Sequence, residues 1–432
     1  MNQIAIGLIG AGTVGGGVVK ILHSRAAALE AAGVPVRLAR IADKATERFA
    51  QLPVGDAVCS GDAADVTGDP SIAIVIELVG GTTFAKKVVL DALSAGKHVV
   101  TANKALIAEF GPELFECAAK NGVSLYFEAS VGGGMPVIKT IREGLVGNEV
   151  VSVKTIINGT CNYILSKMSS EGRAFDNVLA EAQKNGYAEA DPTLDVGGGD
   201  TGHKVAIMAS LISGGYVPYS ALVVEGITDI GAEDIAFARE LGYVIKLLGV
   251  INRSGKGGGV DVRVHPAMLP VHHILASVSD VFNAVLFEGD SVGRILLYGK
   301  GAGEMPTGSA VVSDIADVAR NISSGVKVRI PMEYYGASRR IEVLPIAEIT
   351  SRYYLRFTVT DKPGVLASIA SHLGEEAISI ASVMQKEGYA DDSVPVIILT
   401  HKAKEQGVRR ALTKIEQMDL VRKNTRLIRI EE

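Results

Sequence analysis

The chain has 432 residues, of which 47% are hydrophobic and 21% charged, and its formal net charge is −5. This length exceeds one ordinary core and predicts about three domains. The acidic balance, without any run of Lys or Arg, argues against a nucleic-acid partner.

The cysteines and the apolar segments indicate the compartment. Cys59, Cys117 and Cys161 are widely spaced, so they predict neither a disulfide framework nor a zinc knuckle. No basic segment precedes the first apolar run, and no uninterrupted apolar stretch reaches about 18 residues. We therefore expect a cytoplasmic protein without a signal peptide or a membrane span.

The first third of the chain alternates strand-like and helix-like segments. Short β-branched runs begin at residues 4–10 and recur up to "SLYFEAS" at residues 124–130, and helical stretches that end in glycine lie between several of them. This alternation predicts an α/β fold with a Rossmann-like, doubly wound parallel sheet. We assign it to residues 1–134 and expect residues 304–345 to complete it.

The motif "GAGTVG" follows the first predicted strand and opens a helix. Glycines at these positions allow a tight turn, close approach of the backbone to a pyrophosphate and close packing of the helix on the strand. We therefore expect a dinucleotide site here rather than a glycine-rich turn without a ligand. The expected contacts are Gly10, Gly12, Thr13, Val14 and Gly15.

The second predicted strand ends in "ARIADK", where Asp43 precedes Lys44. An acid at this position binds the adenosine ribose and favours NAD, whereas Arg40 or Lys44 would hold a 2′-phosphate and favour NADP. Asp43 also lies further beyond Gly15 than the usual spacing of about 20 residues. The sequence leaves the choice between NAD and NADP open.

The stretch "TANK" ends with Lys104 and follows the strand that contains Val99 and Val100. A loop lysine is usually a solvated surface residue. Lys104, however, lies at the carboxyl edge of the sheet, where ligands of such folds bind.

From about residue 135 the pattern changes. A strand at residues 150–157 leads through Asn158 and Gly159 into helices, and later strands are joined by "NRSGKGGG", which predicts a hairpin loop. We interpret residues 135–303 as a second, mixed α/β domain that carries the catalytic groups.

A predicted helix at residues 200–211 places Asp200 and Lys204 on one face. An Asp–Lys pair with this spacing is most often a surface ion pair. Here the same face continues into apolar residues, so the charges must be paired or line a cleft. With Glu189 and Asp191 upstream, they suit a substrate that carries an ammonium group and an oxygen that exchanges a proton. The apolar residues of this face are Ile207, Met208 and Leu211.

The stretch "EASVGGGMP", residues 128–136, leaves the last predicted strand of the parallel sheet. Its glycines expose backbone carbonyls and Glu128 adds a carboxylate, a combination that would hold a monovalent cation. A flexible interdomain crossing explains the same composition equally well.

Beyond the second domain, residues 353–432 predict the order βαββαβ. This pattern marks a separate small domain, which we assign to residues 350–432. Its first strand and helix are joined by a turn that contains Asp361, Pro363 and Gly364. The first backbone N–H groups of that helix are free to receive a ligand carboxylate.

Taken together, the motifs resemble those of homoserine dehydrogenase. "GLIGAGTVG", "TANKALI", "EASVGGGMPVI", "INGTCNYIL", "GYAEADPTLDVGGGDTGHKVAI" and "GKGAGEMPTGSAVVSDI" occur in the order and spacing of that family, and the tail from "FTVTDKPGVLASIA" resembles an ACT domain. The resemblance covers essentially the whole chain. It implies reversible NAD(P)-dependent interconversion of L-aspartate 4-semialdehyde and L-homoserine in threonine, methionine and isoleucine biosynthesis.

The resemblance also implies roles for individual residues. Lys204 matches the acid/base lysine, and Lys104 matches a second active-site lysine that also contacts the cofactor. Glu189 and Asp200 match the acids that bind homoserine. Further cofactor contacts are expected at Asp43, Lys44, Gly186 and Gly303. A sodium site is expected at Glu128 and the carbonyls of Val131, Gly133 and Met135.

The resemblance further implies a homo-oligomer, a dimer or a tetramer, with L-threonine as the effector of the ACT-like domain. One departure from the family is the loop "VGGGD" before Asp200, which is more glycine-rich than usual.

Two other functions remain open. Cys161 follows "NGT" and would serve as the thiol nucleophile of an acylating semialdehyde dehydrogenase. No histidine lies near it in the sequence, and a small buried cysteine is the commoner role. The second alternative is a non-catalytic amino-acid sensor. The acids and lysines of the predicted cleft argue against it.

Overall fold

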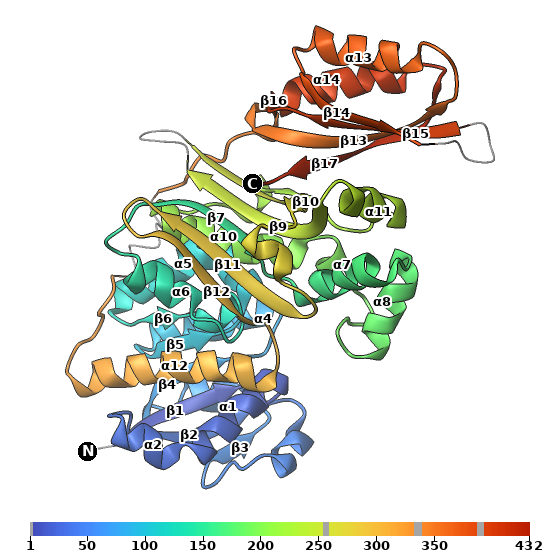
Figure 1. Ribbon diagram of the computed structural model, residues 1–432. Helices are drawn as coiled ribbons and strands as arrows, with labels where there is room; N and C mark the ends of the chain where they lie inside the picture. The colour runs from blue at the N-terminus through green and yellow to red at the C-terminus, as the bar shows by residue number, and fades with distance from the viewer. Residues whose placement is uncertain (1–2, 254–258, 332–338, 387–392) are drawn as a thin grey trace.

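The computed structural model describes residues 3–253, 259–331, 339–386 and 393–432 (Figure 1). Residues 254–258 of the predicted hairpin loop lie outside these ranges. The parallel sheet and its helices form one end of the molecule, a mixed sheet with its helices forms the middle, and the C-terminal unit forms the other end (Figure 1).

The predicted doubly wound sheet is confirmed. Within the described residues it has six parallel strands in the order β3-β2-β1-β4-β5-β6. Successive strands are added on one side of β1 up to β3 and on its other side from β4 onward. This switch point between β1 and β4 creates the crevice where ligands bind in such sheets. The strands are β1 (Ile4–Ile9), β2 (Val36–Ala42), β3 (Val58–Ser60), β4 (Ile72–Glu77), β5 (His98–Thr101) and β6 (Leu125–Tyr126).

Helices cover both faces of this sheet. Helices α1 (Thr13–Ser24) and α12 (Glu304–Ser323) share one apolar core with it, while α4 (Thr83–Ser94) and α5 (Lys104–Asn121) belong to the core on the opposite face. Glycine permits the contact between α1 and α12, because a Cβ on Gly17 would lie 2.3 Å from the carbonyl oxygen of Glu304. The shorter helices here are α2 (Ala26–Ala31) and α3 (Ala64–Thr67).

Lys104, expected in a loop, is the first residue of α5. The helix starts here because the Asn103 side chain accepts a hydrogen bond from the backbone N–H of Leu106 at 3.1 Å, which satisfies one of the donors that a helix start leaves unpaired. Lys104 is therefore held at the sheet edge by a capped helix.

The second sheet is mixed and runs through two parts of the molecule. In the part of the chain that the structure describes, its order is β12-β11-β7-β9-β10-β17-β13-β15-β14, with β8 and β16 as side strands. The strands before the C-terminal unit are β7 (Val150–Ile156), β8 (Val223–Val224), β9 (Tyr243–Arg253), β10 (Val260–Pro270), β11 (Phe282–Gly289) and β12 (Gly293–Lys300).

The C-terminal unit follows the predicted βαββαβ order, with the two-residue strand β16 added before the second helix. Its helices pack on one face of its strands around a separate apolar core, as Figure 1 shows. Strand β17 also pairs with β10, with Ala267 opposite Arg429, so the sheet continues into the middle part. The elements are β13 (Thr350–Thr360), α13 (Val365–Glu375), β14 (Ile380–Gln385), β15 (Ser393–Thr400), β16 (Ala403–Lys404), α14 (Glu405–Glu416) and β17 (Val421–Ile430).

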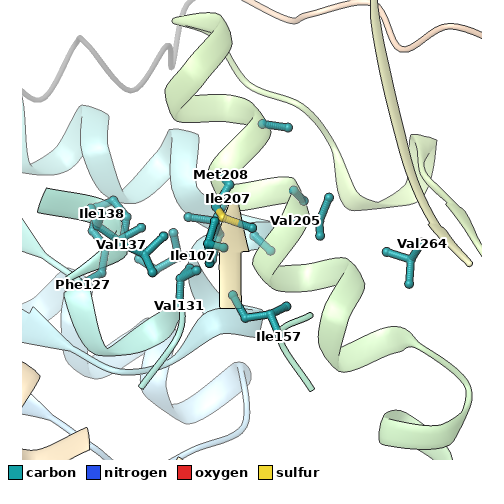
Figure 2. Packing of buried hydrophobic residues seen from close by; sticks show 14 of the residues in the cluster. Ile107, Phe127, Val131, Val137, Ile138, Ile157, Val205, Ile207, Met208 and Val264 are labelled. Carbon is teal, nitrogen blue, oxygen red and sulfur yellow. The ribbon is translucent and has the colours of Figure 1, made fainter. Parts of the chain in front are cut away.

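Helix α10 (Gly199–Ser213) lies in the centre of the molecule and contains the predicted Asp–Lys pair. Its apolar side chains, among them Ile207 and Met208, point toward Ile107 of α5 and the segment around Val137 (Figure 2). On another side it abuts β9, where a Cβ on Gly249 would lie 2.3 Å from a methyl group of Val205. The other helices of this part are α6 (Val137–Lys139), α7 (Gly159–Glu171), α8 (Phe175–Lys184), α9 (Thr193–Val196) and α11 (Ala232–Glu240).

Among the helices of the described residues, none combines the length and the apolar character that a membrane crossing requires.

Candidate active site

Asp200 and Lys204 form a buried ion pair at the start of α10. Gly198 precedes the helix with a φ of +83°, a conformation that favours glycine. The ammonium of Lys204 donates to Oδ2 of Asp200 at 2.7 Å and to the carbonyl oxygen of Ile157 at 2.8 Å. The two side chains are 12% and 8% exposed, so this is not the solvated surface pair that the spacing usually indicates.

Lys104 brings a second positive charge to this pair. Its Nζ lies 3.2 Å from Oδ1 of Asp200, so the carboxylate has one lysine on each oxygen. Burial alone would raise the pKa of Asp200, but the charges of Lys204 and Lys104 lower it to about 2. Asp200 is therefore an anion across the working pH range.

Asn158 and Asp195 also belong to this arrangement, although sequence reasoning gave neither a role. The Asn158 side chain accepts from the N–H of Cys161 at 2.8 Å, which caps α7, and donates to Asp195 at 2.7 Å and to Asp200 at 2.8 Å. Burial raises the pKa of Asp195. An asparagine between a strand and a helix is a recognisable cap signal. We call Lys104, Asn158, Asp195, Asp200 and Lys204 the acid–lysine site.

The two acids upstream of α9 are exposed to solvent. Glu189 is exposed, and its carbonyl accepts from the side chain of Gln183 at 3.1 Å. Asp191 is exposed as well and accepts from the hydroxyl of Thr193 at 2.6 Å. Among the contacts of the described residues, none joins either carboxylate to Asp200. The predicted role of Glu189 in substrate binding stays a prediction.

Cys161 lies beside the site and is inaccessible to solvent. Its side chain is fully buried, and Sγ donates to the carbonyl oxygen of Asp195 at 3.2 Å. Burial and the nearby carboxylates of Asp195 and Asp200 raise the pKa of the thiol well above its usual value. Because the thiolate is the nucleophile, this environment disfavours acyl transfer through Cys161.

The glycine motif forms a cradle at the start of α1. Gly10 has a φ of +99°, and a Cβ on Gly15 would lie 2.0 Å from the carbonyl oxygen of Gly10. A cavity of about 450 Å³ opens beside Gly10 and Gly12, and Asp43 and Lys44 line it. Bare backbone, a helix N-terminus and this cavity fit a dinucleotide.

The charged residues near this cavity differ in whether they are available to contact a dinucleotide. Oδ2 of Asp43 accepts from the N–H of Ala11 at 2.6 Å, which ties the strand end to the glycine loop. Lys44 and Arg48 line the cavity, and Arg48 lies 3.3 Å from Asp43. Arg40 instead pairs with Asp69 at 2.5 Å, away from the cavity. Sequence reasoning missed Arg48, since nothing in the local pattern separates it from a surface arginine.

The two glycines expected to contact the cofactor lie in different places. Gly303 caps α12 with a φ of +123°, next to Glu304, whose carboxylate accepts from Lys20 of α1 at 2.6 Å. Gly186 follows α8 with a φ of +75°, next to Tyr187, whose carbonyl accepts from Thr160 at 2.6 Å. Gly303 is thus near the glycine cradle, and Gly186 is near the acid–lysine site.

Glu128 is buried at the junction of the parallel sheet and the middle part. Its two carboxylate oxygens each accept a backbone N–H at 2.8 Å, from Ile138 and from Lys139. Burial raises the pKa of Glu128 to about 7. Gly132 and Gly133 turn the following backbone with φ values of +78° and +57°. A buried carboxylate beside a tight turn suits a cation bound mainly by carbonyls. Among the described residues no group of three or more His, Cys, Asp or Glu forms a metal site.

Comparisons with known proteins agree along the whole chain. The family model described as homoserine dehydrogenase matches residues 136–316, and the model for the NAD binding domain of homoserine dehydrogenase matches residues 10–128. The chain is 44% identical to the homoserine dehydrogenase of Neisseria gonorrhoeae, covering 100% of this chain and 99% of that protein. It is also 44% identical to that of Pseudomonas aeruginosa, with 100% of both covered.

Solved structures give the same result. A homoserine dehydrogenase from Thiobacillus denitrificans superposes with a TM-score of 0.95 at 42% identity, covering 100% of this chain and 99% of that one. A hyperthermophilic archaeal homoserine dehydrogenase mutant in complex with NADPH superposes with a TM-score of 0.64 at 25% identity, covering 76% of this chain and 99% of that one.

Proposed function

The chain belongs to the homoserine dehydrogenase family, and from this membership we propose roles for the residues of the acid–lysine site and its surroundings. The protein is an NAD(P)-dependent oxidoreductase that reversibly reduces L-aspartate 4-semialdehyde to L-homoserine, a reaction of threonine, methionine and isoleucine biosynthesis.

Lys204 is the acid/base group of the reaction. An ammonium has three donors, and Asp200 and the Ile157 carbonyl accept two of them. The third is left for the substrate oxygen. In reduction Lys204 polarises the aldehyde and gives a proton to the nascent alkoxide, and in oxidation its neutral form takes the hydroxyl proton of homoserine. The observation that carries this role is the buried contact of 2.7 Å between Lys204 and Asp200.

Asp200 and Glu189 bind the ammonium group of the substrate. Asp200 is the better supported of the two, because it is a buried anion whose position is fixed by Lys104 and Asn158. Glu189 is exposed, so its role requires that substrate binding bring its carboxylate inward. Lys104 holds Asp200 from the sheet edge and adds positive charge near the reacting oxygen.

NAD or NADP supplies or accepts the hydride when bound. The backbone of Gly10 to Gly15 and the N-terminus of α1 hold the pyrophosphate, with Gly303 beside them. Asp43 is suited to ribose hydroxyls, and Lys44, with Arg48, is suited to a 2′-phosphate. Arg40 is the weaker candidate for that phosphate, because Asp69 already pairs with it.

Three finer assignments complete the proposal. Glu128 and the carbonyls of Val131, Gly133 and Met135 bind a sodium ion. The ion stabilises the backbone where the chain passes from the parallel sheet into the middle part of the molecule. The C-terminal unit is an ACT-like domain that binds L-threonine at the turn before α13. The enzyme works as a homo-oligomer, a dimer or a tetramer, because the edges of βαββαβ units pair readily across subunits.

The test of the acid/base role compares Lys204→Ala with Lys104→Ala, assayed by absorbance of the reduced nicotinamide with each cofactor. We expect Lys204→Ala to lower kcat by about 10²–10⁴-fold, while the dissociation constant of NADPH changes little. Near-wild-type turnover in a folded Lys204→Ala variant would refute the role. Comparing kcat/KM for NAD and NADP in the wild type settles the cofactor preference.

A further inference from the structure

Arg429 of β17 lies fully buried where the C-terminal unit joins the middle part. Its side chain is 1% exposed and contacts two carboxylates. It donates to Glu225 through both terminal nitrogens, at 2.8 and 3.1 Å, and to Glu405 at 2.7 and 3.0 Å. Because β17 pairs with both β10 and β13, its backbone position is fixed from two sides. Glu225 is thus held in a two-pronged contact by a residue of the C-terminal unit.

The segment that contains Glu225 rests directly on the turn before α10. The N–H of Ile227 donates to the carbonyl of Val196 at 2.8 Å. A Cβ on Gly226 would lie 2.2 Å from that carbonyl oxygen, and a Cβ on Gly198 would lie 3.3 Å from the carbonyl oxygen of Glu225. The two backbones are therefore in contact without side chains between them.

The turn held in this way connects two members of the acid–lysine site. Asp195 precedes Val196 directly, and Gly198 is the residue from which α10 and Asp200 begin. Three of the four residues between Asp195 and Asp200 are glycines, which resist displacement poorly by themselves. Residues 225–227 therefore give this glycine-rich turn a backbone contact from outside.

We propose that Glu225 is a positioning residue for the acid–lysine site: Arg429 fixes its carboxylate, and its backbone segment fixes the turn that sets Asp195 and Asp200. The C-terminal strand thus contributes to the geometry of catalysis without touching substrate. This inference rests on the roles proposed above for Asp200 and Lys204.

The experiment uses the full chain with Glu225→Ala. Arg429 stays paired with Glu405 in this variant, so no buried charge is left alone. We expect kcat/KM for homoserine to fall by about 10- to 100-fold, since small misplacements of reacting groups have effects of this size. The dissociation constant of NADPH, measured by fluorescence, should change less than about twofold, because the glycine cradle lies in another part of the chain. Glu225→Gln, which keeps an acceptor for Arg429, should recover part of the loss.

The matched control is Glu240→Ala. Glu240 also pairs with a cation of the C-terminal unit, Lys386, but it belongs to α11 and not to the segment on the turn. It should retain wild-type kinetics. Equal kinetics for Glu225→Ala and wild type would overturn the inference, as would equal losses in both variants. If Lys204→Ala stays active, the proposed function fails instead, whatever Glu225 does.

Discussion

Asp200 and Lys204 stand one helical turn apart on α10 and meet at 2.7 Å, while the other carboxylate oxygen of Asp200 faces Lys104 at 3.2 Å. One buried anion therefore fixes two lysines that come from different parts of the chain. Removing the anion would leave two neighbouring ammonium groups without their partner, which is costly in a buried site.

Asp200→Asn should therefore impair catalysis more than an ordinary loss of one substrate contact. We expect kcat/KM for homoserine to fall by about 10²-fold or more, with both kcat and KM affected. The two lysines lose the anion that orients them, and the substrate ammonium loses its proposed acceptor. Steady-state kinetics with saturating cofactor measure this. Asp191→Asn is the control, because Asp191 is exposed and, among the described residues, accepts hydrogen bonds from Thr193 alone. Equal effects of the two substitutions would contradict the assignment.

The pH dependence of homoserine oxidation follows from the same pair. Lysine accepts a proton only when neutral, so oxidation should accelerate from neutral toward alkaline pH. Asp200, with its pKa lowered to about 2 by the two lysines despite burial, stays ionised throughout and adds no limb to the profile. The measurement is kcat against pH, with deuterium-labelled homoserine to verify that hydride transfer limits the rate. A flat profile under that condition would exclude a lysine base.

The sequence predicts the parts of this site that depend on local patterns. The spacing of the apolar residues after Asp200 predicts the buried face of α10, and the glycines after β1 predict the cradle, because both signals repeat within a few residues. Asn158 and Asp195 were missed, since their partnership arises from segments far apart in the chain. The sequence indicates that Lys104 lies at the sheet edge. It does not reveal that a helix begins there, because Pro112 interrupts the helical pattern of α5.

Longer-range features could not be read from the sequence at all. Strand β17 pairs with β10 through two residue pairs, Ala267 with Arg429 and Met268 with Ile430. So short a pairing produces no periodic pattern in the sequence. The ion pair of Arg40 with Asp69 is another such feature. Because Arg40 is held by Asp69, the cations that line the cofactor cavity are Lys44 and Arg48 among the described residues. The topology of the fold determines which charged residues meet. Local sequence patterns therefore do not predict these ion pairs.

Cys161→Ser separates the dehydrogenase from an acyl-transfer enzyme. The thiol is buried and its pKa is raised by burial, so turnover should stay within about threefold of wild type, whereas loss of a nucleophile would abolish it. Stability should fall modestly, because a hydroxyl replaces a small apolar group in a packed site. Kinetics and thermal melting of the purified variant test both points. Phosphate-dependent activity, or complete loss on substitution, would favour the acylating alternative.

Sodium removal tests the site proposed at Glu128. A cation that binds only the folded state raises stability by about 2.7 kcal/mol at 100 times its dissociation constant. Replacing sodium by tetramethylammonium at constant ionic strength should therefore lower Tm, and Glu128→Gln should remove the difference. Glu143→Gln serves as the control, since Glu143 pairs with Arg142 and Arg329 instead. Identical melting temperatures in both salts for the wild type would exclude a stabilising sodium ion.

The proposed effector site is tested at Gly364, which precedes α13 with a φ of +90° and is exposed. A helix N-terminus attracts a carboxylate, and a fixed negative charge beside it repels one. We expect threonine to inhibit the wild type, Gly364→Asn to keep that inhibition, and Gly364→Asp to raise the inhibitory concentration by about tenfold, since Asn and Asp tolerate this conformation similarly.

The alternative reading is that the C-terminal unit only mediates assembly. Sedimentation of both variants distinguishes an assembly role from an effector site. An assembly role predicts a changed oligomer size and unchanged threonine sensitivity. Inhibition that is equal in all three proteins and competitive with homoserine would place threonine in the active site, where it resembles the substrate. Inhibition that weakens only in Gly364→Asp, with oligomer size and uninhibited turnover preserved, requires a second site, since coupling between ligands needs two distinct sites.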